Sequence, residues 1–424
     1  MTAPVTEPAA RTGGTDATST AAPVVTGIGV TAPNGFGTEA WWAAVLRGES
    51  GIRPVTRFDA EQYPAKLAGE IRDFVPEQHV PGRLLPQTDH MTRLALAAAD
   101  EALTDADIDP AALPDYAAGV ITASSAGGFE FGQRELEALW SKGGQYVSAY
   151  QSFAWFYAVN TGQISIKNGL RGPSGVLVTE QAGGLDAVAQ ARRQIRKGVQ
   201  LLVTGGVDSA LCPWGWAAHL AGGELTEVAD PTRAYLPFSG DASGHVAGEG
   251  GALLVLEDAA AAEARGAKTY GAVAGYAATF DPAPGSGGAP RLRAAAEQAL
   301  KEAGLRPDDV DVVFADAAGR RDADRAEAEA IAALFGPSGV PVTAPKTMTG
   351  RLAAGGAALD LAAALLALRD QVIPPTVHVA EPAADCRIDL VTEVRRPAGG
   401  LRTALVLARG RGGFNAAMVV RRSG

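Results

Sequence analysis

The amino-acid sequence predicts an α/β protein made of two α/β/α layered halves with mostly parallel central sheets. Short apolar runs alternate with segments of helical period along most of the chain, which favours parallel strands covered by helices on both faces. The alternation starts again after a turn-rich segment at 281–288, and this indicates two halves of comparable size. An internally duplicated architecture and two independent doubly wound domains both fit the pattern, because periodicity alone does not separate them.

The first half begins with a glycine-punctuated strand at 24–30, followed by a helix at 39–47. An alanine-rich segment at 91–103 has apolar positions spaced as in a long helix. A further helix begins next to Gln181 and crosses between two strands. The other apolar runs of this half are predicted strands at 117–122, 174–179, 201–207 and 252–256.

The second half repeats this alternation. Its predicted helices are at 291–303, 324–334 and 357–369, and its predicted strands are at 310–314, 340–343, 403–407 and 416–420. We assign residues 1–22 to a disordered tail, because this segment has almost no large apolar side chains and lacks the basic start and apolar centre of a signal peptide. The two halves then cover 23–265 and 266–424.

Composition restricts the classes of function. The chain has 424 residues, 47% of them hydrophobic and 20% charged, which is typical of a globular protein with a large core. A formal net charge of −10 argues against a nucleic-acid-binding surface. The apolar runs are too short to span a membrane. Two cysteines do not make a disulfide framework, so we expect a reducing, cytoplasmic location.

Common cofactor and metal motifs are absent from the sequence. It contains no phosphate-binding loop of the G-x-x-x-x-G-K-[S/T] form, no H-E-x-x-H and no G-x-S-x-G nucleophile elbow. Its five histidines are scattered without the spacing of metal ligands. We therefore expect neither a cofactor nor a metal site.

The joint at Gln181 has the setting of a catalytic nucleophile without the chemistry of one. The strand at 174–179 turns directly into a helix through Gln181, Ala182, Gly183 and Gly184. Free backbone N–H groups and the positive end of the helix dipole favour an anion at such a position. A glutamine amide has no ionisable proton, so covalent catalysis from Gln181 is excluded.

Around this joint the sequence resembles the β-ketoacyl synthases of the thiolase fold. Within them it is most similar to the chain-length factor, the ketosynthase beta subunit of type II aromatic polyketide synthases. The resemblance runs from about residue 24 to the C-terminus. The blocks that carry it are specific only in combination and lie at 152–165, 179–184, 207–216, 237–238, 248–251 and 349–356.

The resemblance implies that all three catalytic positions of this family have changed. Condensing members use a cysteine nucleophile and two histidines. Gln181 stands at the position of the cysteine, Asp316 at that of the first histidine and Arg351 at that of the second, while Lys346 is retained. In the family these positions face one cavity, so Asp316 and Arg351 are candidates for an ion pair that fills it. Separate partners for each are the alternative.

The implied function is a non-condensing, chain-length-determining subunit of an acyltransferase complex. Its expected partners are a cysteine-bearing ketosynthase, with which it forms a heterodimer, and an acyl carrier protein that carries malonyl and poly-β-ketone chains. The alternative is a decarboxylase that primes the synthase from the malonyl carrier through Gln181. Related loading enzymes with a glutamine at this position keep their histidines, however, and this chain does not. A free-standing condensing enzyme is a third interpretation, and the absence of the nucleophile and of both histidines argues strongly against it.

The resemblance places the residues that gate the polyketide tunnel on 127–136 and at Trp214. Phe129, Gly132 and Leu136 follow each other at three- and four-residue spacing, as on one helix face. Core packing is the competing interpretation for Phe129 and Leu136. Glycine inside a helix costs about 1 kcal/mol relative to alanine, so Gly132 is better explained by an enlarged tunnel. We therefore expect a decaketide or longer product.

Two further segments have open interpretations. The aromatic-rich run at 153–157 suits an obligate subunit interface, and a buried core explains it equally well. The basic residues Arg192, Arg193, Arg196 and Lys197 fit an acidic carrier protein. Electrostatic complementation of their own helix C-terminus is the preferred explanation.

Overall fold

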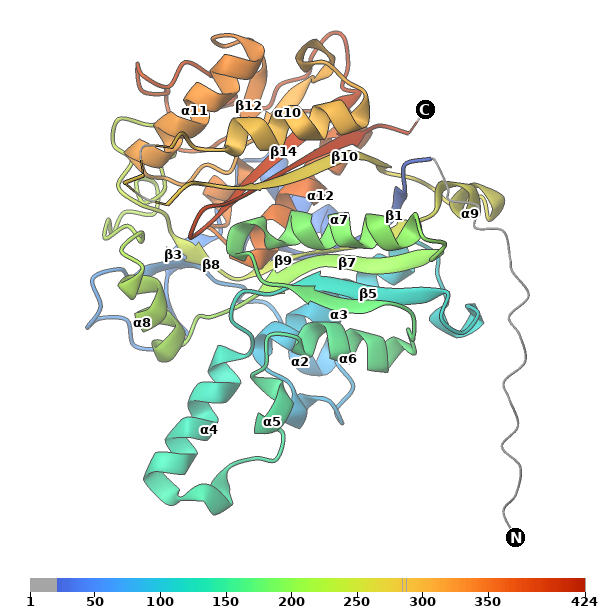
Figure 1. Ribbon diagram of the computed structural model, residues 1–424. Helices are drawn as coiled ribbons and strands as arrows, with labels where there is room; N and C mark the ends of the chain where they lie inside the picture. Colours follow the sequence, from blue (N-terminus) through green and yellow to red (C-terminus); the bar gives the residue numbers. More distant parts are fainter. Residues whose placement is uncertain (1–20, 284, 287, 424) are drawn as a thin grey trace.

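The computed structural model describes residues 21–283, 285–286 and 288–423 (Figure 1). Apart from its last two positions, the predicted tail at 1–22 lies outside the described residues. Among the described residues, no helix combines the length and the apolar character that a membrane crossing requires.

The strands form two half-sheets that are joined at the chain's first strand. Along the sheet, the first half runs β1 (Val24–Ala32), β9 (Gly250–Glu257), β7 (Leu201–Asp208), β5 (Ala118–Ala123) and β6 (Ser174–Leu177). The second runs β10 (Gly271–Phe280), β15 (Phe414–Arg421), β14 (Thr403–Gly410), β11 (Val312–Phe314), β12 (Pro341–Thr343) and β13 (Asp389–Leu390). A short antiparallel pairing of β1 with β10 joins the halves.

Strand direction follows the same plan in both halves. The outer strands β6, β5 and β7 pair in parallel, as do β14, β11, β12 and β13. The strands at the junction of the halves pair antiparallel. Two minor pieces complete the strands: β2 (Gly35–Phe36) pairs with β1, and a small sheet contains β3 (Ile52–Pro54), β4 (Leu67–Gly69) and β8 (Ala247–Gly248).

Helices α7 (Gly183–Ile195) and α12 (Ala354–Asp370) pack between the two half-sheets, and they make the halves a single structure (Figure 1). Outer layers are formed by α3 (His90–Asp105) and α6 (Val159–Asn168) on one side, and by α10 (Leu292–Ala303) and α11 (Arg321–Phe335) on the other. Residues 354–368 of α12 are all buried, which explains why its side chains, apart from Asp360, are small or apolar on every face of the helix. This shared layer resolves the two architectures in favour of the duplicated, thiolase-like one.

The remaining helices lie around the N-terminal half. They are α1 (Thr38–Leu46), α2 (Pro76–His79), α4 (Phe129–Lys142), α5 (Gln151–Ala154), α8 (Pro213–Ala221) and α9 (Ala259–Ala264). Figure 1 shows α4 projecting away from the layered body. Its position outside the layers makes α4 a candidate for contact with another protein.

The predicted strands and helices are all present, with their ends shifted by a few residues. The strand predicted at 174–179 ends at Leu177, because Thr179 already leads into a turn of 3₁₀ helix at Glu180–Ala182. One long strand, β10, was not predicted from the sequence. It is built largely from glycine and alanine, and such small side chains give no strong apolar alternation.

Candidate functional site

Gln181 lies fully buried at the turn that precedes α7. The preceding residue, Glu180, has a φ of +52°, a conformation that costs energy for a residue with a side chain. Its carboxylate accepts a hydrogen bond from the backbone N–H of Arg411 at 3.0 Å, which ties the turn to the end of β14. Gln181 is 0% exposed, and within the described chain neither of its amide atoms has a hydrogen-bond partner. Gln181 thus lies buried just before the start of α7, and its amide has no ionisable proton that would make it a nucleophile.

The amide of Gln181 fits against α12 because residue 356 is glycine. A Cβ atom at Gly356 would lie 2.2 Å from Nε2 of Gln181 and 2.7 Å from its Cδ. Such distances are far below van der Waals contact, so α12 has no side chain where the amide lies. Gly356 is therefore part of the site, although its role is not visible in the sequence.

Asp316 and Arg351 form the ion pair that the sequence analysis proposed. The guanidinium of Arg351 donates to both carboxylate oxygens of Asp316 at 3.1 Å, and both side chains are buried. Burial by itself raises the pKa of Asp316, but the charges of Arg351 and Lys346 and the hydrogen bonds from Arg351 together outweigh it, so the net pKa is lowered. The pair is therefore charged and bidentate, and the alternative of separate partners is wrong.

Further groups lock this pair in place. Lys346 Nζ donates to the backbone oxygen of Asp316 at 3.0 Å and lies 2.6 Å from the carboxylate of Asp360. Arg409 donates its backbone N–H to Asp316 Oδ1 at 2.9 Å. Glu327 accepts from the backbone N–H groups of Asp316 and Ala317 at 2.7 and 2.9 Å. Asp316, Arg351 and Glu327 thus all make hydrogen bonds within the protein, and a buried network of this kind is rigid.

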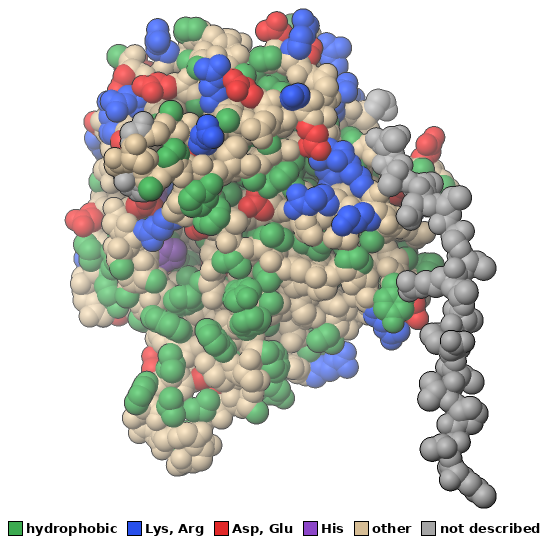
Figure 2. Space-filling model, viewed as in Figure 1, with side chains coloured by type: hydrophobic (Ala, Val, Ile, Leu, Met, Phe, Trp, Pro, Cys, Tyr) green, Lys and Arg blue, Asp and Glu red, His purple; other side chains and the backbone are tan. Residues whose placement is uncertain are grey.

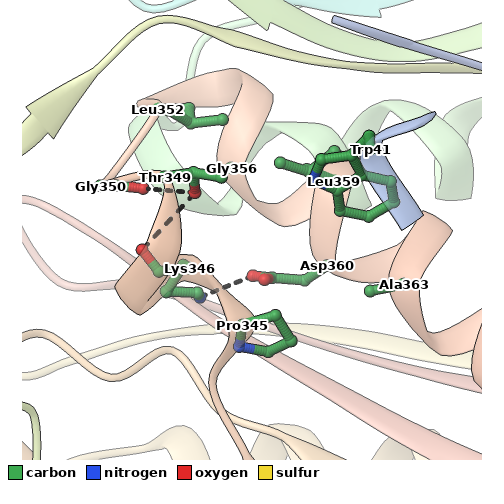
Figure 3. Close-up of a pocket in the computed structure, with 10 residues that line it drawn as sticks. All are labelled: Trp41, Pro345, Lys346, Thr349, Gly350, Leu352, Gly356, Leu359, Asp360 and Ala363. Atoms are coloured by element: carbon green, nitrogen blue, oxygen red, sulfur yellow. Dashed lines mark hydrogen bonds and ion pairs between the residues drawn. The ribbon is translucent and has the colours of Figure 1, made fainter. Parts of the chain in front are cut away.

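The cavity beside Lys346 is too small for a substrate. Figure 3 shows it enclosed by residues of α12, of α1 and of the segment that leads into α12. Its volume is about 10 Å³, which is about the space that one water molecule needs. Its lining includes Lys346, Asp360 and Gly356, the glycine that faces Gln181. This cavity has room for a water molecule and none for an acyl chain.

Glu327 makes stability depend on pH in this region. Burial, followed by the charge of Asp316, raises the pKa of this carboxyl from 4.5 to about 7. The folded chain therefore holds a proton that the unfolded chain has lost, so this contribution to stability is complete below about pH 4.5 and disappears as pH rises through about 7.

Glu327→Gln is expected to remove this dependence. The free energy of unfolding is measured in urea for both proteins. The value for the unsubstituted protein minus that for the variant should be largest near pH ~5 and should decrease towards pH ~8. Asp324, whose pKa burial raises to about 6, contributes equally to both proteins and cancels in the comparison. Parallel pH profiles of the two proteins would contradict the assignment.

Three of the four predicted gate residues meet at the start of α4. The rings of Phe129 and Trp214 have centroids 4.5 Å apart, and a Cβ atom at Gly132 would lie 3.1 Å from Cζ3 of Trp214. In this chain the space beside Gly132 is thus occupied by the Trp214 ring, where the sequence had indicated open tunnel. Leu136 lies one turn further along α4 and is 37% exposed.

The structure also bears on the aromatic segment at 153–157 and on the basic cluster at 192–197. Trp155, Phe156 and Tyr157 are each at least 40% exposed, so core packing does not explain them. In the basic cluster, Arg192 and Arg196 both form ion pairs with Glu302 of the same chain. Among the described residues, no group of three or more His, Cys, Asp and Glu side chains is placed to hold a metal ion.

Family models match most of the chain. The N-terminal domain of β-ketoacyl synthases matches residues 22–262, and the C-terminal domain matches 270–380. Among solved structures, the ishigamide ketosynthase/chain length factor is 29% identical and covers 95% of this chain and 99% of its own, with a TM-score of 0.85. A second solved structure is a type II polyketide synthase acyl-carrier protein in complex with its ketosynthase bound to the hexaketide. The matching chain of that complex is 26% identical, with a TM-score of 0.84, and the match covers 95% of this chain and 99% of the other.

Curated relatives are closer in sequence. The actinorhodin polyketide putative beta-ketoacyl synthase 2 of Streptomyces coelicolor is 60% identical over 94% of this chain and 98% of its own length. The tetracenomycin polyketide synthase ketoacyl synthase beta subunit of Streptomyces glaucescens is 59% identical over 95% and 98%. These similarities confirm the resemblance found in the sequence. The chain belongs to the β-ketoacyl synthase family, and within it to the ketosynthase beta subunits, or chain-length factors, of polyketide synthases.

Proposed function

We propose that this chain is the non-condensing subunit of a type II polyketide ketosynthase and sets the length of the poly-β-ketone made by its partner. The observation that carries the proposal is the filled site: Gln181 is inert and buried, and the Asp316–Arg351 pair replaces two imidazoles. A subunit without a nucleophile contributes to condensation through the partner that has one. The partner is a cysteine-bearing ketosynthase, supplied by an acyl carrier protein in the cytoplasm.

An exposed apolar surface supports pairing with a subunit of the same fold. Strand β6 pairs only with β5 within the described chain, so one edge of the sheet is open. Around this edge and along α4 to α6 are exposed apolar side chains, and Figure 2 shows hydrophobic side chains gathered over this part of the surface. They are Leu136, Leu139, Trp140, Trp155, Phe156, Tyr157, Ile166 and Val178. Exposed apolar patches of this kind mark protein interfaces.

A groove extends the same surface. It has a volume of about 560 Å³, and its lining is mostly apolar. Its lining includes Phe153 and Phe156 together with Val159, Gly162 and Ile166 of α6. We assign both the groove and the aromatic residues at 153–157 to the heterodimer interface.

The gate residues give the chain its role in this pair. Phe129, Gly132, Leu136 and Trp214 lie on the projecting side of the molecule, next to the exposed apolar surface. A polyketide that grows on the cysteine of the partner would reach them at the subunit interface. The decaketide or longer product expected from Gly132 and Leu136 stays a prediction, because the Trp214 ring fills the space beside Gly132 in the single chain.

Malonyl decarboxylation through Gln181 has less support. The amide is fully buried against Gly356, and the cavity of about 10 Å³ that Gly356 lines is too small for a malonyl thioester. The side chains at the positions of the two histidines are already bonded to each other. Donors that are engaged in this way do not stabilise an enolate.

Gly132→Phe tests the proposed function. The purified ketosynthase pair, supplied with carrier protein and malonyl donor, should make shorter products with this variant, because the new ring and the displaced Trp214 ring both narrow the gate. Ser141→Phe is the matched control, since residue 141 is exposed on the opposite face of α4. The chain without its partner should make no polyketide. Unchanged product length from an active Gly132→Phe pair would refute the gate.

A further inference from the structure

Trp214 is held by a single turn of α4 through three different contacts. Its ring lies against the ring of Phe129, at a centroid distance of 4.5 Å and an interplanar angle of 38°. The face of α4 at Gly132 has no side chain, which leaves room for the ring edge. The third contact is a hydrogen bond from the backbone N–H of Trp214 to Oε1 of Gln133, at 2.8 Å.

The hydrogen bond from Trp214 satisfies a group that α8 cannot satisfy itself. The first N–H groups of a helix have no partner within the helix. In α8, Pro213 has no N–H, and the Sγ atom of the N-cap residue Cys212 accepts from Gly215 at 3.5 Å. The N–H of Trp214 instead finds its acceptor on another helix, at Gln133.

The amide of Gln133 is itself oriented from its other end. Its Nε2 donates to Oε1 of Glu137, one turn further along α4, at 2.7 Å. This leaves Oε1 of Gln133 directed at the start of α8. Two side chains on α4 thus form a relay that ends at the backbone of Trp214.

We propose that Gln133 is a positioning residue that fixes Trp214 against Gly132 and thereby sets the chain length that the tunnel accepts. The inference rests on the proposed function of Trp214 as a gate. Gln133 acts through Trp214, because its bond is to the backbone from which the indole ring projects. Without that acceptor, water must solvate the N–H of Trp214, and the start of α8 separates from α4.

Gln133→Leu tests the relay with a side chain of similar size and good helix propensity. The ratio of off-length to native-length products from the reconstituted pair should rise about fivefold, the equivalent of ~1 kcal/mol for one hydrogen bond. The double variant Gln133→Glu with Glu137→Gln exchanges the carboxylate and the amide between the two positions. Both hydrogen bonds remain possible, because the carboxylate at 133 accepts from the N–H of Trp214 and from the new amide at 137. It should restore the native product ratio, and Glu137→Gln alone should leave it unchanged.

A second measurement reports on Trp214 directly. In the pair labelled with 5-fluorotryptophan, the ¹⁹F resonance of Trp214, assigned with Trp214→Phe, should shift in Gln133→Leu and return in the double variant. This readout does not depend on product formation, so it also decides the case of an inactive pair. An unshifted resonance in Gln133→Leu would overturn the positioning role. A shifted resonance with unchanged product length would instead refute the gate and leave the positioning role standing.

Discussion

Arg351→Met is expected to lower the free energy of unfolding by about 3–5 kcal/mol, because it leaves the buried carboxylate of Asp316 without its bidentate partner. Two backbone oxygens, those of Asp316 and Arg409, also lose hydrogen bonds from the guanidinium at 2.9 and 3.1 Å. Urea unfolding of the purified subunit, followed by circular dichroism, measures the loss.

Matched variants separate the buried pair from an ordinary ion pair. Arg320 pairs with Glu224 and Asp322 but is 40% exposed, so Arg320→Met should cost no more than ~1 kcal/mol. Combining Asp316→Leu with Arg351→Met should recover at least half of the loss, because it removes the stranded charge. If Arg351→Met costs as little as Arg320→Met, the ion pair does not stabilise this site in the way described.

Gly356→Ala is expected to destabilise the chain by about 1–3 kcal/mol through overlap with the buried amide of Gln181. Alanine favours a helix interior over glycine by about 1 kcal/mol, so the loss is attributable to the overlap rather than to the backbone. The sign of the effect is therefore opposite to that of the same change at an open helical position.

The second substitution Gln181→Ala should relieve the overlap. In a double-mutant cycle by urea unfolding, Gly356→Ala should be neutral or stabilising in the Gln181→Ala background, with a coupling of at least ~1 kcal/mol. Additive effects of the two changes would show that Gln181 and Gly356 do not depend on each other. The Gln181→Ala chain should also support the native product length, since the amide touches no tunnel residue in this proposal.

Together these predictions separate the two regions of the molecule. The region around Gln181, Asp316 and Arg351 is rigid, buried and polar, and substitutions there should change stability. The region around α4 and Trp214 is exposed in the single chain, and substitutions there should change the product or the assembly. In the proposed function, the first region has no catalytic side chains and supports the fold. The second region contacts the partner and the growing chain.

Much of this organisation is predictable from the sequence. Local apolar periodicity indicated the main strands and helices, because burial of one face requires a regular spacing along the chain. The residue types at 181, 316 and 351 excluded condensation, because nucleophilicity depends on the side chain alone. Opposite charges at 316 and 351 also led to the correct ion pair.

Other features were decided only by the tertiary structure. β10 consists largely of glycine and alanine and packs against α10 and β15, so its own pattern carried little signal. The role of Gly356 depends on Gln181, which is distant in sequence, and the space at Gly132 is filled from α8 by Trp214. Gln133 had no distinguishing motif, since a glutamine on a helix surface is ordinary until another helix presents an unpaired N–H. Chemistry that belongs to a single side chain was readable from the sequence, whereas contacts between distant segments arise only when packing brings them together.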